Sequence, residues 1–219
     1  MVIVNFKVYP EALGPEAIKL SKVCEKVAAE TGASIALVPA LTDLMMIVKE
    51  VKLPVLAQHF DIINAGSHTG WVPIEAVKKT GAIGSLLNHS ERKLPDDDLK
   101  IAIEKCRNSG IESVVCADTI EEVKNVAKFL PDYIAIEPPE LIGGNISVTT
   151  AKPEIVIQAV TSIHAIESKI QVICGAGVKS GKDVRKALEL GTVGVLIASG
   201  VVKASDPQIT LRDLVNGLG

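Results

Sequence analysis

Three ionisable side chains in this sequence have the types needed for proton transfer beside a bound anion. Lys7 ends an aliphatic run near the N-terminus, His89 lies in the segment "NHSER", and Glu137 directly follows the apolar run "YIAI". A carboxylate can act as a base, an imidazole can polarise an oxygen, and an ammonium group can balance an anion. Each residue alone is often structural. A catalytic function requires a fold that brings all three together.

Two small-residue segments could complete such a site by binding the anion. They are "CGAGV" (174–178) and "ASG" (198–200), and each follows an apolar run. Small side chains leave backbone N–H groups accessible, and such groups can cradle a negative charge. Both segments would also suit ordinary tight turns.

The elements that must position these residues alternate along the chain. Of the residues, 47% are hydrophobic and only 3% are aromatic, which is typical of aliphatic strands covered by helices on both faces. This composition favours an α/β fold. Eight short apolar runs read as strands, at residues 2–8, 34–40, 54–60, 82–89, 112–118, 133–138, 170–178 and 193–199.

Helix signals fall between these runs. A proline opens and a glycine closes several helical patterns, and Ser, Thr or Asp stands where others begin, at 15–32, 73–81, 95–110, 119–122, 180 and 206. Eight such units predict a closed (β/α)₈ barrel in one compact domain, residues 1–219, with an open doubly wound sheet as the alternative. In a barrel, Lys7, His89 and Glu137 all fall at the carboxyl ends of strands, where active sites form.

A long connection follows Glu137. The stretch from Pro138 to Ala151 exceeds the roughly 2 to 6 residues usual between a strand and the next helix. Two prolines stiffen its start and two glycines loosen its later part. We expect a hinged lid that expels water from the site, formed by Pro138, Pro139, Glu140, Leu141, Ile142, Gly143 and Gly144.

Composition argues against several other functions. The formal net charge is −3, from 23 basic and 26 acidic residues, and no basic run could follow a nucleic-acid backbone. No apolar run is long enough to span a membrane, and the N-terminus reads as a first strand, so we expect a cytoplasmic protein. The four cysteines are scattered, as in buried, reduced thiols. His59, Asp61 and His68 lack the tight spacing of metal ligands, so no metal is expected.

Taken together, these motifs resemble the triosephosphate isomerase family along nearly the whole chain. "NFK" resembles its first-strand motif, "NHSER" its G-H-S-E-R motif, "AIEPPELIGG" its lid motif, and "NAGSHTG" (64–70) its interface loop. The short length and the forms of the glycine-rich loops resemble the archaeal branch. Asn88 in place of the family's glycine and Lys93 after the arginine depart from the pattern.

The resemblance implies a role for each matched residue. Glu137 would take a carbon-bound proton, His89 would polarise the substrate carbonyl from the first turn of a helix formed by "SERK", and Lys7 beside Asn5 would supply positive charge. Glu91 would support these groups. Further contacts to the phosphorylated substrate would come from Phe6, Ile142, Gly177, Ala198 and Ser199.

The resemblance further implies a triose phosphate substrate, no cofactor and a homo-oligomer. The loop Asn64–Gly70 would insert into a neighbouring copy, with a dimer as the minimum and a tetramer in the archaeal branch. Two alternatives remain open at this point. One is another phosphate-binding barrel isomerase, and the other is a barrel that binds a sugar phosphate without catalysis.

Overall fold

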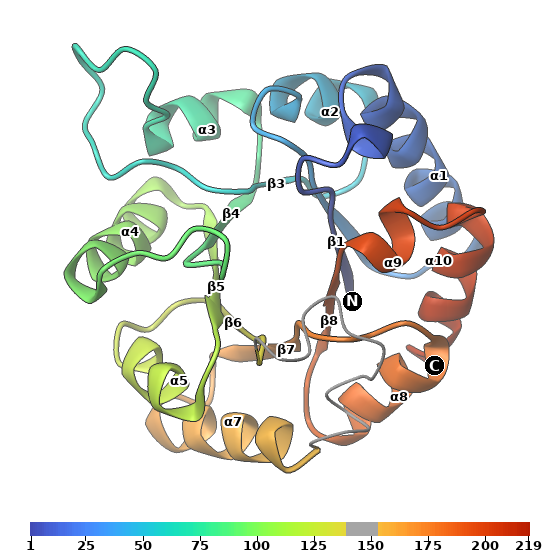
Figure 1. The fold of residues 1–219 in the computed structure, drawn as a ribbon. Coiled ribbons are helices and arrows are strands. Elements are labelled where there is room, and N and C mark those ends of the chain that lie inside the picture. Colours follow the sequence, from blue (N-terminus) through green and yellow to red (C-terminus); the bar gives the residue numbers. More distant parts are fainter. Residues whose placement is uncertain (139–152) are drawn as a thin grey trace.

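The computed structural model describes residues 1–138 and 153–219 of the chain. Eight parallel strands surround a central axis, and helices form an outer ring (Figure 1). The strands are β1 (Val2–Asn5), β2 (Ile35–Val38), β3 (Leu56–Ala57), β4 (Gly84–Leu87), β5 (Glu112–Ala117), β6 (Tyr133–Ile136), β7 (Gln171–Cys174) and β8 (Gly194–Ile197). The helices are η1 (Pro10–Ala12), α1 (Pro15–Thr31), α2 (Leu44–Glu50), α3 (Ile74–Thr80), α4 (Asp96–Ser109), α5 (Ile120–Ala127), α7 (Pro153–Ile166), α8 (Gly181–Glu189), α9 (Ser199–Val202) and α10 (Pro207–Asn216).

The strands close into a barrel. Their hydrogen-bonded order is β2-β1-β8-β7-β6-β5-β4-β3, and the two end strands meet through a parallel bridge between Leu37 and Val55. At this closure the backbone N–H of Leu37 donates to the carbonyl of Pro54 at 2.9 Å. The predicted (β/α)₈ barrel is confirmed, and the open sheet is wrong.

Local capping chemistry sets the helix boundaries. Pro15 opens α1, and Gly32 ends it in the left-handed region at φ 70°, where glycine has no steric penalty. At the start of α8, the side chains and backbones of Ser180 and Asp183 form a reciprocal capping box. Asp206 caps α10 by accepting a hydrogen bond from the backbone N–H of Ile209.

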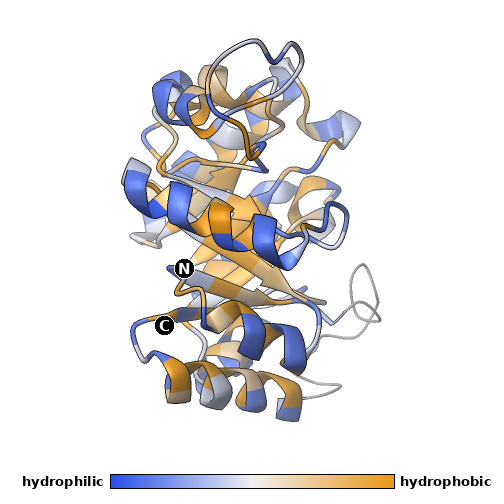
Figure 2. Cartoon of the chain, turned by 90° about the vertical axis from the view of Figure 1, so that its left-hand side faces the viewer, coloured by the Kyte–Doolittle hydropathy of each residue, from blue (hydrophilic) through white to orange (hydrophobic). Residues whose placement is uncertain are grey.

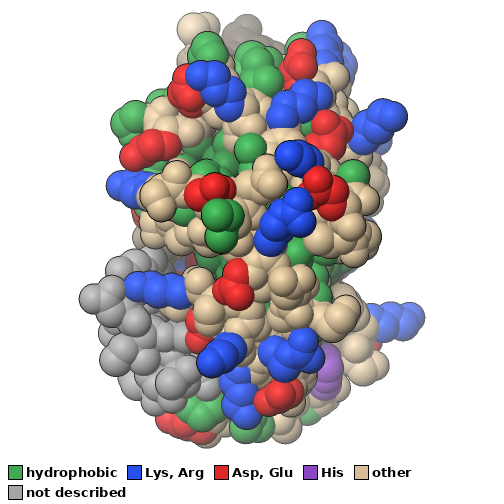
Figure 3. Space-filling model, turned by 90° about the vertical axis from the view of Figure 1, so that its right-hand side faces the viewer, with side chains coloured by type: hydrophobic (Ala, Val, Ile, Leu, Met, Phe, Trp, Pro, Cys, Tyr) green, Lys and Arg blue, Asp and Glu red, His purple; other side chains and the backbone are tan. Residues whose placement is uncertain are grey.

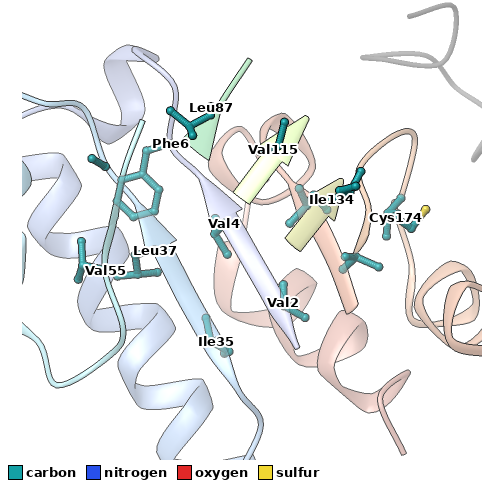
Figure 4. Close-up of a cluster of buried hydrophobic side chains, with 14 of the residues drawn as sticks. Val2, Val4, Phe6, Ile35, Leu37, Val55, Leu87, Val115, Ile134 and Cys174 are labelled. Carbon is teal, nitrogen blue, oxygen red and sulfur yellow. The ribbon is translucent and has the colours of Figure 1, made fainter. Parts of the chain in front are cut away.

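Strand residues alternate between two hydrophobic layers. Val2 and Val4 of β1 belong to the outer layer, packed between the strands and the helices, whereas Ile3 faces the barrel interior. Figure 4 shows part of the outer layer, and Figure 2 shows the apolar strands enclosed by helices in which hydrophilic and hydrophobic residues alternate. The interior layer is formed by Ile3, Ala36, Val38, Leu56, Leu86, Val114, Cys116, Ala135, Ile173 and Leu196. This alternation determines which residues reach the mouth of the barrel.

The outer surface carries charges of both signs. On the face that carries α1, α8 and α10, basic and acidic side chains are interspersed (Figure 3). Within residues 1–138 and 153–219, no helix combines the length and the apolar character needed to cross a membrane.

Candidate active site

A cavity of about 500 Å³ opens at the carboxyl ends of the strands. Side chains from five strand ends line it, including the three ionisable residues singled out in the sequence. Its lining consists of Asn5, Lys7, Tyr9, His89, Glu91, Glu137, Gly175, Gly177, Val178, Lys179, Leu196, Ile197, Ala198, Ser199 and Gly200. The fold therefore brings Lys7, His89 and Glu137 into one site.

Lys7 is held in an unusual backbone conformation just beyond β1. Its φ is +48°, in the left-handed region that non-glycine residues rarely adopt. Such a conformation costs about 1 to 3 kcal/mol and is fixed here by hydrogen bonds on both sides of the residue. The backbone N–H of Lys7 donates to Oδ1 of Asn5 at 2.9 Å, and Nε2 of Gln58 donates to the carbonyl of Lys7 at 2.8 Å.

The ammonium group of Lys7 is paired with Glu91. Nζ lies 2.8 Å from Oε1 of Glu91, and the lysine side chain is 13% exposed while the glutamate is 62% exposed. Solvent screens such an exposed partner, so this ion pair is weak. Lys7 remains at the cavity wall as a cation available to the ligand.

Phe6, between these two polar residues, has a different environment. Its side chain is fully buried in the outer hydrophobic layer, near Leu37 and Val55 (Figure 4). Strand alternation accounts for this, because Asn5 and Lys7 share the parity of the interior-facing Ile3 and Phe6 does not. The Phe6 side chain therefore faces away from the cavity.

The imidazole of His89 has a defined tautomer. Its Nδ1 accepts a hydrogen bond from the backbone N–H of Glu91 at 3.1 Å, which requires a lone pair on Nδ1. The proton of the neutral ring is therefore on Nε2. Burial and, secondarily, the charge of Lys7 lower the pKa of His89, so the ring is neutral near pH 7.

The segment after His89 forms a tight turn instead of the expected first helical turn. The backbone N–H of Arg92 donates to the carbonyl of His89 at 2.7 Å, and α4 begins only at Asp96. The backbone donor to His89 therefore comes from a turn.

Glu137 is the most deeply buried acid of the site. It is 3% exposed, and its Oε2 lies 3.8 Å from Nε2 of His89. Burial raises the pKa of Glu137 to about 7, while a hydrogen bond from the Cys116 thiol and the charge of Lys7 act in the opposite direction. Among the described residues, Oε2 has no hydrogen-bond partner. A buried carboxylate with a free oxygen and a pKa near neutrality is suited to taking up a proton.

The loops after β7 and β8 contribute backbone to the cavity. Gly177 has φ +69°, and α9 begins at Ser199 with Ala198 as its N-cap residue. The first N–H groups of a helix have no acceptor within it, so they are available to an anion. Gly177, Ala198 and Ser199 all line the cavity.

Comparison with known proteins agrees with this geometry. A family model described as triosephosphate isomerase matches residues 1–217. The triosephosphate isomerase of Methanocaldococcus jannaschii is 46% identical to this chain over 215 residues, 98% of each protein. That of Methanobacterium bryantii is 48% identical over 216 residues, which cover 99% of this chain and 96% of the relative. The chain belongs to the triosephosphate isomerase family.

A third archaeal triosephosphate isomerase, from Methanothermus fervidus, is 44% identical over 215 residues, 98% of this chain and 97% of the relative. The resemblance to the archaeal branch of the family is thereby confirmed.

Most of the predicted lid of this family member lies outside the described residues. Of the predicted lid, Pro138 is described and follows Glu137 directly. Pro139, Glu140, Leu141, Ile142, Gly143 and Gly144 lie outside the described residues.

Several residues that line the cavity of this triosephosphate isomerase family member or contact Glu137 were not predicted from the sequence. Tyr9 and Lys179 line the cavity, and the buried Cys116 contacts Glu137. Gly175 lies against Glu137, where an added Cβ would come within 2.4 Å of Cγ of the glutamate. The alternation of β5 could have revealed Cys116, because it lies two residues after Val114, and both side chains face the barrel interior.

The metal prediction concerned His59, Asp61 and His68. Nε2 of His59 lies 3.4 Å from Oδ1 of Asp61, which also pairs with Arg92 at 2.8 Å. Within the described part of this triosephosphate isomerase family member, no three His, Cys, Asp or Glu residues are grouped as potential metal ligands. Asp61, which is partly buried, accepts hydrogen bonds from Arg92 and from the backbone N–H of Val72.

Proposed function

We propose that this chain interconverts glyceraldehyde 3-phosphate and dihydroxyacetone phosphate, as an intramolecular aldose-ketose isomerase of glycolysis and gluconeogenesis. The observation that carries the proposal is the meeting of three groups in one cavity. Oε2 of the buried Glu137 lies 3.8 Å from Nε2 of His89, and Lys7 lines the same cavity.

The proposed reaction moves one proton between two adjacent carbons. The Glu137 carboxylate takes the proton from the carbon next to the carbonyl, and the bonding electrons move onto the carbonyl oxygen to give an enediolate. His89 donates a hydrogen bond from Nε2–H to the developing oxyanion. Glu137, now protonated, returns the proton to the neighbouring carbon, while the hydroxyl proton on the oxygen of that carbon passes to the oxyanion, so that the second oxygen becomes the new carbonyl. The carboxylate is regenerated, so no other proton carrier is consumed.

The environment of the two groups supports these roles. A base works best when its pKa lies near the working pH, and burial raises the pKa of Glu137 to about 7. His89, whose pKa is lowered by burial, stays neutral and donates without giving up its proton. Lys7 balances the charge of the enediolate and of the phosphate, and Asn5 holds the Lys7 backbone in place.

We propose that the phosphate binds at the loops that follow β7 and β8. Gly177, Ala198 and Ser199 would present backbone N–H groups there, because these residues line the cavity beside the start of α9. Ile142 would join them when residues 138–144 close as a lid. Closure would exclude water and so protect the enediolate from loss of phosphate.

We further propose that the chain forms a homo-oligomer through the loop Asn64–Gly70. A small cavity of about 140 Å³ adjoins the active site, and its lining includes Lys7, His89 and Val8. Val8 is 70% exposed and Trp71, at the end of the loop, is 57% exposed. The loop projects from the ring beside α3 (Figure 1), so it could fill this cavity in a second copy. A dimer is the minimum, and a tetramer follows from the resemblance to the archaeal branch.

Residues 1–219 are proposed to act as one catalytic domain in the cytoplasm, with no nucleic-acid or membrane partner. The strands that form the site come from β1 at one end of the chain to β8 near the other, which supports one functional unit.

A coupled assay tests the proposed activity. Purified protein is mixed with glyceraldehyde 3-phosphate, and the dihydroxyacetone phosphate formed is followed by its enzymatic reduction. Rapid turnover is expected. Absence of turnover together with thermal protection by a triose phosphate would favour a non-catalytic binding barrel, and absence of both would favour a barrel isomerase with another substrate.

A further inference from the structure

The alternation of β4 breaks immediately before His89. Leu86 faces the barrel interior and Leu87 belongs to the outer layer. Continued alternation would point residue 88 into the mouth of the barrel and residue 89 toward the helices. The structure shows the reverse, because His89 lines the cavity and Asn88 bonds to Glu122 of α5.

Asn88 produces this reversal through its backbone. Its φ is +58°, in the left-handed region. Asparagine tolerates this region better than most non-glycine residues. A left-handed residue at the end of a strand turns the following side chain to the other face, and here that side chain is His89.

The Asn88 side chain holds the conformation in place. It is buried, and its Nδ2 donates to the carbonyl of Cys116 at 3.0 Å and to Oε1 of Glu122 at 2.7 Å. Its Oδ1 accepts from the backbone N–H of Leu94 at 3.0 Å. One amide thus links β4 to β5 and α5, and ties both ends of the turn 88–94 that carries His89.

The acceptor of this link is itself fixed. Glu122 accepts from the backbone N–H of Asp118 at 2.7 Å and from Nζ of Lys93 at 3.0 Å. Lys93 also pairs with Asp118 at 2.8 Å. Asn88 is therefore anchored to a connected polar network and not to a freely moving surface side chain.

We propose that Asn88 is a positioning residue, which sets the orientation and tautomer of His89 through its left-handed backbone and its three hydrogen bonds. The proposal rests on the proposed role of His89. A glycine at position 88, as in the family pattern, would permit the same φ but would not by itself enforce it, because glycine also populates many other conformations. In this chain the turn is held by the Asn88 amide together with Lys93, which shares its acceptor Glu122. With glycine at position 88, the turn would present the Glu91 N–H and the His89 ring in several relative positions.

The Asn88→Gly variant separates positioning from backbone strain, because glycine adopts positive φ freely. We expect kcat to fall roughly 10- to 100-fold, the scale of a misplaced catalytic group, with little change in KM. We also expect the ¹⁵N NMR spectrum of the His89 ring to change. The wild type should show one neutral tautomer protonated on Nε2, and the variant should show a mixture.

A matched control removes a buried clamp at the other end of the barrel. Oγ of Ser113 donates to Oδ2 of Asp132 at 2.8 Å, and Ser113 is 1% exposed. Ser113→Ala should lower thermal stability, while kcat and the His89 spectrum stay as in the wild type. If Asn88 acted only on stability, the two variants would behave alike.

A double variant provides a second measurement. Glu122→Ala removes the acceptor on α5, so combining it with Asn88→Gly should add little further loss of kcat. A folded Asn88→Gly variant with wild-type kcat and an unchanged His89 spectrum would overturn the inference. A different result would show that His89 does not have its proposed catalytic role. In that case His89→Gln would retain full activity, whatever the NMR spectrum of Asn88→Gly shows.

Discussion

Gly175 leaves bare backbone against the side chain of Glu137, and an added Cβ would lie 2.4 Å from Cγ of the glutamate. The glutamate reaches its position because residue 175 has no side chain. Since Glu137 is 3% exposed and has little room to shift, a methyl group would displace its carboxylate. The location of the base therefore depends on a glycine of the neighbouring strand end.

Gly175→Ala is expected to lower kcat by about 100-fold, because even a small misplacement of a base is costly. Steady-state kinetics measure this. Gly194→Ala is the matched control, since its Cβ would meet the carbonyl of Met1 at 2.2 Å at the far end of the barrel. That variant should lose about 1 to 3 kcal/mol of stability from overpacking yet keep its kcat. Equal kcat losses in both variants would contradict the argument.

Shortening the base gives a direct test of its role. In Glu137→Asp, the carboxylate is withdrawn by one methylene, so we expect a loss of kcat of roughly 100-fold or more with the fold intact. Circular dichroism reports whether the fold is intact, and stopped-flow kinetics report kcat. Wild-type turnover in this variant would remove Glu137 from its proposed role.

The activity should depend on pH through Glu137. Because the pKa of the free enzyme's carboxyl is raised to about 7, kcat/KM should rise with pH and level off above that value. The lowered pKa of His89 keeps the ring neutral over this range. A pH profile of kcat/KM measures the midpoint. A midpoint near 4.5, the ordinary value of a glutamate, would mean that burial does not control the base.

The same shift links stability to pH. The folded protein holds the Glu137 proton up to about pH 7, whereas the unfolded chain releases it near 4.5. The folded state therefore binds more protons between these values, and the free energy of unfolding should fall by about 3 kcal/mol as pH rises from 4.5 to 7. Urea unfolding at a series of pH values gives the free energy of unfolding of the wild type and of Glu137→Gln. The difference between the two proteins isolates the contribution of Glu137, because the other titrating groups contribute equally to both. Parallel curves for the two proteins would refute the linkage.

Lys7→Ala should weaken substrate binding as well as turnover, because the same ammonium group is proposed to balance the phosphate and the enediolate. We expect a raised KM and a lowered kcat. Lys19→Ala is a suitable control, since Lys19 forms a similar 2.7 Å pair with Glu16 on the surface of α1. A Lys7 variant with wild-type kcat/KM would show that the charge is not used.

Assembly can be tested at Val8, which lines the small cavity proposed for the partner loop. Val8→Lys would place a charge where an apolar contact is expected, so the sedimentation coefficient at micromolar concentration should decrease. Ile209→Lys is the control, because Ile209 is 66% exposed, close to the 70% of Val8, but lies on α10. A wild-type protein that sediments as a monomer would contradict the proposed oligomer.

The sequence predicted the helix starts well because capping is local. The reciprocal bonds between Ser180 and Asp183, and the cap at Asp206, involve residues at most three positions apart. Strand ends were less predictable. The run 54–60 reads as one strand, but β3 comprises only Leu56–Ala57, because pairing across a barrel depends on partners distant in sequence.

The sequence indicated that Lys7, His89 and Glu137 lie together, since parallel strands bring their carboxyl ends to one face, and the structure places all three in one cavity. The sequence did not indicate Tyr9 or Lys179, which also line the cavity. The left-handed backbone of Asn88 could not be read from the sequence, because this conformation depends on contacts with β5 and α5. The raised pKa of Glu137 likewise arises from burial by residues elsewhere in the chain.

The closure between β2 and β3 has a consequence for how the molecule opens. Leu37 and Val55 form an isolated bridge there, whereas β1 and β2 are paired over four residues from Val2 to Asn5. Few amide protons are shielded along this seam, so we expect deuterium to enter there before it enters the other strand pairs. Local unfolding of the barrel would then begin by separation of β2 from β3.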